Sequence, residues 1–159
     1  MYMDWSRLIR SGPVEVPDKE YSLEELSPKF FELFHDDIVS FIIKAMGYLE
    51  DKWSIDDVME SLKEGKMQGW IIYDKNHGVI SGICITEVIE FPKEKVLNIT
   101  GLGGNGVSEW IHLISGIEEF AHSKGCKAVE LYGRPGWKKL LAENGYKKYR
   151  VVLRRSIKE

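Results

Sequence analysis

The sequence predicts a single domain of mixed α/β class, with a central mixed, mostly antiparallel sheet and helices on both faces. Three observations carry this prediction. Helical periodicities come first along the chain, two strand-like runs then form a hairpin pattern, and a strand–helix–strand unit follows. A hairpin pairs its strands antiparallel, whereas a crossover helix makes its two strands parallel, so we expect both kinds of pairing in one sheet.

Two helices are expected in the first half of the chain. Ser27 and Pro28 are residue types that favour a helix N-cap and the first helical position, and Gly47 marks the end of the apolar periodicity. Ser54 starts a second helix, which Gly65 closes. The apolar stripe of the first helix consists of Phe30, Phe31, Phe34, Ile38, Phe41, Ile42 and Ala45.

Strands are expected in the second half. The residues from Asp74 to Gly78 are of types that favour turns. The two strand-like runs on either side of this turn therefore predict a hairpin. A short helix is expected around Trp137–Asn144. Apolar and basic residues alternate in the last run, as in a half-solvated strand near the edge of a sheet. The strand-like runs are Met67–Tyr73, Val79–Ile89, Lys95–Thr100, Lys127–Tyr132 and Tyr146–Ile157.

A glycine-rich stretch organises the centre of the second half. It follows the strand Lys95–Thr100 and precedes an amphipathic helix that is expected to begin at Val107 and to end just before Gly125. The first N–H groups of a helix have no internal partner, and glycines allow a phosphate to approach the backbone, so this arrangement favours an anion site. A tight turn that only reverses the chain is the alternative. The glycines are Gly101, Gly103, Gly104 and Gly106.

Composition places limits on the class of protein. The chain has 159 residues, 43% of them hydrophobic and 30% charged, so we expect one domain over residues 1–159, with residues 1–25 as a weakly structured extension. No apolar run approaches the ~20 residues that cross a bilayer, and no secretory signal is seen. We therefore expect a cytoplasmic protein without a membrane partner. Cys84 and Cys126 are expected to be reduced thiols, and no metal-ligand spacing is present.

The net charge of −3 is divided unevenly along the chain. Residues 1–80 contain 9 basic and 16 acidic side chains, whereas residues 81–159 contain 13 and 9. The positive half therefore carries the glycine-rich stretch, which suits a small phosphorylated ligand. Long nucleic acid usually requires a more strongly basic face, so no nucleic acid is expected. A chance imbalance between solvated faces would give the same numbers.

The element order, with glycines between the third strand and the third helix, resembles the GNAT superfamily of acyl-CoA-dependent N-acetyltransferases over residues 25–157. The family's motif is Gln/Arg-x-x-Gly-x-Gly/Ala; Gly104 and Gly106 match it and Gly101 departs from its first position. Asn144-Gly145-Tyr146 is similar to a late family motif. The run Val129–Tyr146 looks more specifically like small GNAT-like proteins of tailed bacteriophages, whose place of action would be the host cytoplasm.

The resemblance implies that acetyl-CoA is a co-substrate and that an amine, on a protein or a small molecule, is the acceptor. It implies that the pantetheine arm of acetyl-CoA lies along Thr100 and Leu102. It also implies that the pyrophosphate lies at backbone amides, and these belong to Gly103, Gly104, Asn105, Gly106 and Val107.

Acetyl transfer requires a base for the amine and an acid for the leaving thiolate. Glu87 ends an apolar strand, and we expect partial burial to raise its pKa, so it is the preferred base. The family's usual acid, a tyrosine, is replaced here by Leu141, so Tyr132 is the expected acid. Arg134 would bind acidic groups of a substrate or pair with an acidic neighbour. The alternatives are Glu130 for the base and Tyr146 or Tyr149 for the acid.

Two functions from different classes therefore stay open. The first is an N-acetyltransferase, which the retained glycines and the positive half favour. The second is a GNAT-fold binding protein without turnover, such as an accessory, structural or host-interaction factor of a bacteriophage with a protein partner. The altered loop and the missing tyrosine favour this second function. The sequence makes no prediction of the oligomeric state.

Overall fold

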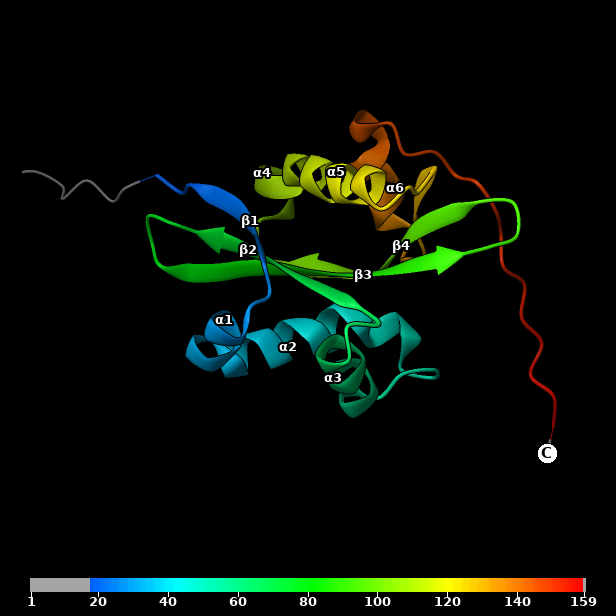
Figure 1. Ribbon diagram of the computed structural model, residues 1–159, viewed down its shortest axis with the longest axis horizontal. Coiled ribbons are helices and arrows are strands. Elements are labelled where there is room, and N and C mark those ends of the chain that lie inside the picture. The colour runs from blue at the N-terminus through cyan, green and yellow to red at the C-terminus, as the bar shows by residue number, and fades with distance from the viewer. Residues whose placement is uncertain (1–17, 159) are drawn as a thin grey trace, which may run out of the picture.

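The structure is a computed structural model that describes residues 18–158 (Figure 1). Its five strands form one sheet in the order β1-β2-β3-β4-β5, with helices on both faces. The strands are β1 (Tyr21–Glu25), β2 (Gln68–Asp74), β3 (Val79–Glu90), β4 (Lys95–Gly104) and β5 (Ala128–Leu131). The α-helices are α1 (Pro28–Leu33), α2 (His35–Met46), α3 (Ile55–Lys63), α4 (Val107–Trp110), α5 (Ser115–Ser123) and α6 (Gly136–Leu141). The short 3₁₀ turns are η2 (Gly47–Leu49), η3 (Ile111–Ile114) and η4 (Ala142–Asn144).

Strand pairing confirms the predicted fold class. Strands β1 to β4 pair antiparallel with their neighbours, and β4 pairs parallel with β5. The predicted hairpin is the pair β2 and β3. The crossover between β4 and β5 passes through α4 and α5, which is how a parallel pair must be connected.

The predicted helix starts are confirmed, and one predicted helix is divided. The Ser27 hydroxyl accepts the Phe30 N–H, and Ser54 forms a capping box with Asp57. The single helix expected up to Gly47 is instead α1 and α2. Phe34 separates them, since its backbone adopts φ −127° and ψ 31°, outside the helical region.

Helices cover both faces of the sheet (Figure 1). Each face carries its own hydrophobic core. The α2 face, covered by α1, α2 and α3, buries Ile38, Phe41, Ile42, Ala45, Met46, Val58, Met67, Ile71, Ile80, Ile83 and Ile85. The α5 face, covered by α4, α5 and α6, buries Trp70, Ile72, Cys84, Leu97, Ile99, Leu102, Trp110, Ile111, Ile114, Ile117, Ala121 and Leu141.

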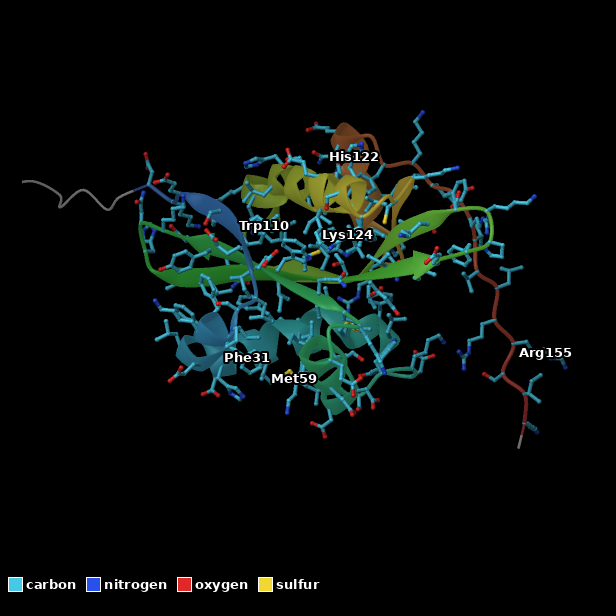
Figure 2. All side chains as sticks on the ribbon, viewed as in Figure 1. Phe31, Met59, Trp110, His122, Lys124 and Arg155 are labelled. Atoms are coloured by element: carbon cyan, nitrogen blue, oxygen red, sulfur yellow. The ribbon has the colours of Figure 1, made fainter. Side chains whose placement is uncertain are left out.

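The single amphipathic helix expected to begin at Val107 and to end just before Gly125 is interrupted, so that prediction was wrong in its continuity. Helix α4 is a single turn, followed by η3 and then by α5. The interruption lies at Trp110, whose backbone adopts φ −125° and ψ −1° and whose indole lies between α4 and the sheet (Figure 2). In the described part of the chain, no helix has the length and apolar character needed to cross a membrane.

Both ends of the chain differ from the predictions. Residues 1–17 of the expected N-terminal extension lie outside the described residues, but Tyr21–Glu25 forms the edge strand β1. The strand expected over Tyr146–Ile157 does not form, so this prediction was wrong. An alternating pattern needs a neighbouring strand to pair with. Here the chain leaves the α5-face core at Tyr146, and Arg154 pairs with Asp51 instead.

Candidate functional site

Strand β4 has two halves with different neighbours. Its first half, Val96–Ile99, lies between β3 and β5, and the last β5 residue in register is Leu131, opposite Ile99. Among residues 18–158, its second half, Thr100–Gly104, pairs with β3 alone. A bulge at Thr100 separates the halves, because Thr86 faces Ile99 while the preceding residue of β3 faces Gly101. The outer edge of Thr100–Gly104 is therefore open.

Backbone groups point from β4 into this open edge. The Asn105 N–H donates to the Ser81 carbonyl oxygen over 2.7 Å, so the peptide N–H of Asn105 faces β3. Successive residues of a strand direct their N–H groups to opposite edges. Leu102 and Gly104 therefore direct their N–H groups toward the edge that β5 leaves free.

The glycines of β4 allow close packing on both sides. A Cβ atom on Gly101 would lie 2.7 Å from Met46 Sδ, and one on Gly103 would lie 3.4 Å from the Cα of Ala45 in α2. A Cβ on Gly104 would lie 2.2 Å from the Ser81 carbonyl oxygen. Three of the four glycines are thus strand residues needed for contact, and the turn itself is only Asn105-Gly106.

The turn retains free backbone donors at the start of α4. Gly106 adopts a left-handed conformation, φ 63°, and its carbonyl accepts the Glu109 N–H over 2.9 Å. Both backbone groups of Asn105 are engaged, since its carbonyl also accepts Trp110 Nε1–H over 2.8 Å. Within residues 18–158, the amides of Gly106, Val107 and Ser108 have no hydrogen-bond acceptor.

A carboxylate lies beside this turn. Glu109 Oε1 is 3.7 Å from the place of a Cβ on Gly106. Glu109 Oε2 accepts the Tyr21 hydroxyl over 2.8 Å and lies 3.6 Å from Lys19 Nζ. The negative charge of Glu109 raises the pKa of Lys19. An anion bound at the turn would therefore meet a carboxylate that is partly balanced by one ammonium group.

Glu87 lies in a row of polar side chains on the α2 face. The register places Glu87 of β3 opposite Asn98 of β4, and Asn98 opposite Glu130 of β5. Partial burial raises the pKa of Glu87. Asn98 Nδ2 donates to Thr100 Oγ1 over 3.1 Å, while Asn98 Oδ1 is buried without a partner in the described part of the chain. Both predicted bases, Glu87 and Glu130, therefore lie beside Asn98, which is hydrogen-bonded to Thr100 at the bulge of β4.

Tyr48 was not predicted from the sequence, yet it contacts the bulge directly. Its hydroxyl donates to the Thr100 carbonyl oxygen over 2.6 Å, and burial raises the pKa of Tyr48 to about 12, so it stays a donor at neutral pH. Arg134 lies at the same end of α2, with Nη2 3.3 Å from the place of a Cβ on Gly47. No periodicity signals Tyr48, because it follows the last helical residue of α2.

Comparison with known proteins identifies the fold. No protein-family model matches the sequence, and no curated protein matches it. Solved structures do match. An acetyltransferase of Trypanosoma brucei is 15% identical with a TM-score of 0.60, over 87% of this chain and 100% of its own. Glucosamine-6-phosphate N-acetyltransferase of Arabidopsis thaliana is 14% identical with a TM-score of 0.61, over 87% and 99%. A GNAT family acetyltransferase of Staphylococcus aureus is 15% identical with a TM-score of 0.61, over 86% and 98%.

This chain has the GNAT acetyltransferase fold. The identities are too low to transfer a substrate, so the likeness establishes the architecture alone. In this GNAT fold the open edge of β4 begins where β5 ends, and the glycine turn lies at its far end.

The three candidate tyrosines occupy different environments. Tyr132 follows β5 directly and is 48% exposed, at the point where β4 and β5 part. The Tyr146 hydroxyl is buried without a partner among residues 18–158, and burial raises its pKa, with a further contribution from Glu118. Tyr149 is 69% exposed on the C-terminal segment. Tyr132 is therefore the exposed candidate at the end of β5, whereas the Tyr146 hydroxyl is buried near Cys84, which lies opposite Leu102 of β4.

Proposed function

We propose that this protein is an N-acetyltransferase that moves an acetyl group from acetyl-CoA to an amine of a protein or a small molecule. The observation that carries the proposal is the open edge of Thr100–Gly104, which leads to the free amides of Gly106 to Ser108 within a GNAT fold. An extended ligand with amide groups can add to a free strand edge. A diphosphate can accept hydrogen bonds from unpaired amides before a helix.

The backbone N–H donors of the site fit acetyl-CoA in part. Leu102 and Gly104 offer N–H groups to the pantetheine arm, and Gly106, Val107 and Ser108 offer theirs to the diphosphate. Two features reduce the fit relative to our sequence-based prediction. Asn105 has no free backbone group, and the Thr100 carbonyl already accepts the Tyr48 hydroxyl. We propose no metal in this reaction.

Glu87 and Tyr132 are the proposed proton-transfer residues. Glu87 accepts the proton that the amine loses as its nitrogen bonds to the thioester carbonyl carbon. Tyr132 donates a proton to the thiolate as the carbon–sulfur bond breaks. A positioned base or acid of this kind contributes about 10²–10⁴-fold to a rate. Glu130, in the same row as Glu87, is the alternative base.

The test of this proposal is binding of acetyl-CoA, followed by turnover. We expect acetyl-CoA to raise the melting temperature of the protein. Ser108→Pro removes one free amide in the first turn of a helix, where proline is tolerated, and Ser108→Ala is the matched control that keeps the amide. The proline variant should weaken binding about 10- to 100-fold, as expected for losing a hydrogen bond to a charged group of about 1.5–3 kcal/mol.

Turnover is measured as thiol release from acetyl-CoA with a panel of amines. Gly104 is a poor place for a blocking substitution, because any side chain there would collide with β3. No change in melting temperature at millimolar acetyl-CoA would refute the transferase.

A second function is favoured by the electrostatics of the turn. The Glu109 carboxylate beside Gly106 and the engaged amide of Asn105 oppose tight binding of a diphosphate. These features support a GNAT-fold binding protein without turnover. We propose a bacteriophage accessory or host-interaction factor as its specific form, from the likeness of Val129–Tyr146 to such proteins. Either function is proposed for the cytoplasm, where the free thiols of Cys84 and Cys126 would stay reduced.

A further inference from the structure

The side chain of Asn98 lies at the centre of the polar row on the α2 face, the face that α1, α2 and α3 cover (Figure 1). Strand β3 places Glu87 on one side of Asn98, and β5 places Glu130 on the other. All three residues are partly buried. The row therefore holds an amide between two carboxyl groups, in a place that water reaches only in part.

One atom of this amide lacks a hydrogen bond. Asn98 Nδ2 donates to Thr100 Oγ1 over 3.1 Å, which sets the direction of the amide. The carbonyl oxygen, Asn98 Oδ1, is buried and has no donor among residues 18–158. A buried polar atom without a partner destabilises a fold, and native proteins almost always provide one. The Oδ1 atom therefore needs a donor from a neighbouring side chain.

The neighbours of Asn98 across the sheet can provide that donor only in protonated form. An ionised carboxyl group only accepts hydrogen bonds, whereas a protonated one has an O–H to donate. Directly opposite residues of an antiparallel pair have Cβ atoms about 4.5–5.5 Å apart, so the Glu87 carboxyl group is within reach of the Asn98 amide. Partial burial raises the pKa of Glu87 and thereby favours its neutral form. Glu87 is therefore the better donor of the two carboxyl groups.

Charged and titratable groups around this pair come from β5, from η2 and from the segment after β5. Strand β5 contributes Glu130. Helix α2 packs on β4 through Ala45 and Met46, and η2 contributes the Tyr48 hydroxyl, which is engaged with the bulge. Arg134 lies at the same end of α2. Within residues 18–158, burial is the cause of the raised pKa of Glu87, with no contribution from a charged neighbour.

We propose that Asn98 holds Glu87 in its protonated form, with the Glu87 carboxyl O–H donating to Asn98 Oδ1 and Thr100 keeping the amide turned toward it. Asn98 is thus a positioning residue, which acts through Glu87. A hydrogen bond to the neutral form raises the pKa of a carboxyl group further than burial does alone. The role of this pair in catalysis rests on the proposed transferase, in which a base of higher pKa accepts the proton of the amine more readily once it is ionised.

NMR of the Glu87 carboxyl carbon, recorded as a function of pH without acetyl-CoA, tests the pair. We expect the titration midpoint of Glu87 in the wild type to lie above the ordinary value of 4.5, and the side-chain amide signals of Asn98 to change with the same midpoint. Asn98→Ala removes Oδ1 and should move the midpoint of Glu87 back toward 4.5. Glu130→Ala is the matched control, since it removes the other neighbour of Asn98 and keeps Oδ1, so it should move the midpoint less.

Thiol release gives a second measurement, which depends on the proposed function. With a saturating amine, Asn98→Ala should reach its maximal rate at a lower pH than the wild type, because its base loses the proton earlier. The maximal rate itself should fall, since the base is then weaker. A change of this kind in the pH profile separates a role in proton transfer from a merely structural one.

Three results would overturn the proposal. The first is a wild-type Glu87 that titrates near 4.5. The second is a midpoint that stays constant or rises in Asn98→Ala; a rise would mean that the amide donates Nδ2 to an ionised Glu87. The third is an Asn98 amide that titrates with Glu130 in place of Glu87. The NMR titration needs no acetyl-CoA, so an absence of turnover would refute the transferase and leave the result on the pair intact.

Discussion

The two halves of β4 have the same backbone conformation and different surroundings. Lys95–Ile99 has a strand on each side, and its side chains Val96, Leu97 and Ile99 are almost fully buried. Within the described part of the chain, Thr100–Gly104 has a strand on one side only, and three of its five residues are glycine. One strand therefore serves as core where both edges are paired and as a candidate site where one edge is open.

The bulge at Thr100 marks the change between the halves. At the bulge, the Thr100 carbonyl oxygen accepts the Tyr48 hydroxyl, and Gly101 packs against Met46 of α2. The glycines let α2 pack closely on the α2 face of β4 while the outer edge stays free. Close packing and an open edge thus depend on the same short stretch.

The largest expected effect concerns the base in the row beside the open half. Glu87→Gln keeps the size of the side chain and removes its ability to accept a proton. We expect thiol release to fall about 10²–10⁴-fold, with the acetyl-CoA-dependent rise in melting temperature retained. Glu130→Gln is the matched control, since Glu130 lies in the same row. A large loss in Glu130→Gln alone would transfer the role of base to Glu130.

The pH dependence of Glu87 sharpens the same test. Because burial raises the pKa of Glu87 above its ordinary value of 4.5, the folded protein binds a proton that the unfolded chain releases over the interval between the two values. Stability of the wild type relative to Glu87→Gln should therefore fall as the pH rises through this interval and then stay constant. Thiol release should rise over the same interval, because the base must lose its proton. Urea denaturation and initial rates measure the two trends.

A matched pair of leucines compares the two halves directly. Leu97 and Leu102 are both buried in the α5-face core, one in each half of β4. Leu97→Ala should lower the free energy of unfolding by about 2–5 kcal/mol and leave the acetyl-CoA dissociation constant of the folded protein unchanged. Leu102→Ala should cost less stability, since the open edge allows the backbone to relax, and should weaken binding. Equal effects of the two substitutions on binding would contradict the assignment of the site to the open half.

A smaller effect is expected for the hydrogen bond at the bulge. Tyr48→Phe leaves the Thr100 carbonyl without its donor and should lower the free energy of unfolding by about 1–3 kcal/mol. Tyr132→Phe removes a hydroxyl from a side chain that is half exposed, so it should slow thiol release without a loss of stability. Urea denaturation of both variants distinguishes the structural tyrosine from the proposed acid.

The smallest effect concerns the carboxylate beside the turn. Glu109→Gln removes a negative charge near Gly106 and frees Lys19, so acetyl-CoA should bind roughly two- to fivefold more tightly, the range of a screened surface charge. The gain should shrink as salt is added. Weaker binding after this substitution would mean that the diphosphate does not lie at the turn.

The sequence by itself determined the local features of this protein. The caps at Ser27 and Ser54 and the hairpin of β2 and β3 were predictable, because each depends on residues close together in the chain. The parallel pairing of β4 with β5 followed from the crossover helix between them. The candidate base Glu87 could be named from its place at the end of an apolar run.

Only the tertiary structure decided where the site begins and ends. The bulge at Thr100, the contact with Tyr48 and the row from Glu87 to Glu130 depend on the register between strands that are distant in sequence. Periodicity is the same for every register, so the pattern of one strand does not determine which residues of another lie opposite. The alternating pattern of Tyr146–Ile157 predicted a strand, but no strand forms there. Whether a neighbouring strand is available for pairing depends on the arrangement of the whole chain, which the pattern does not contain.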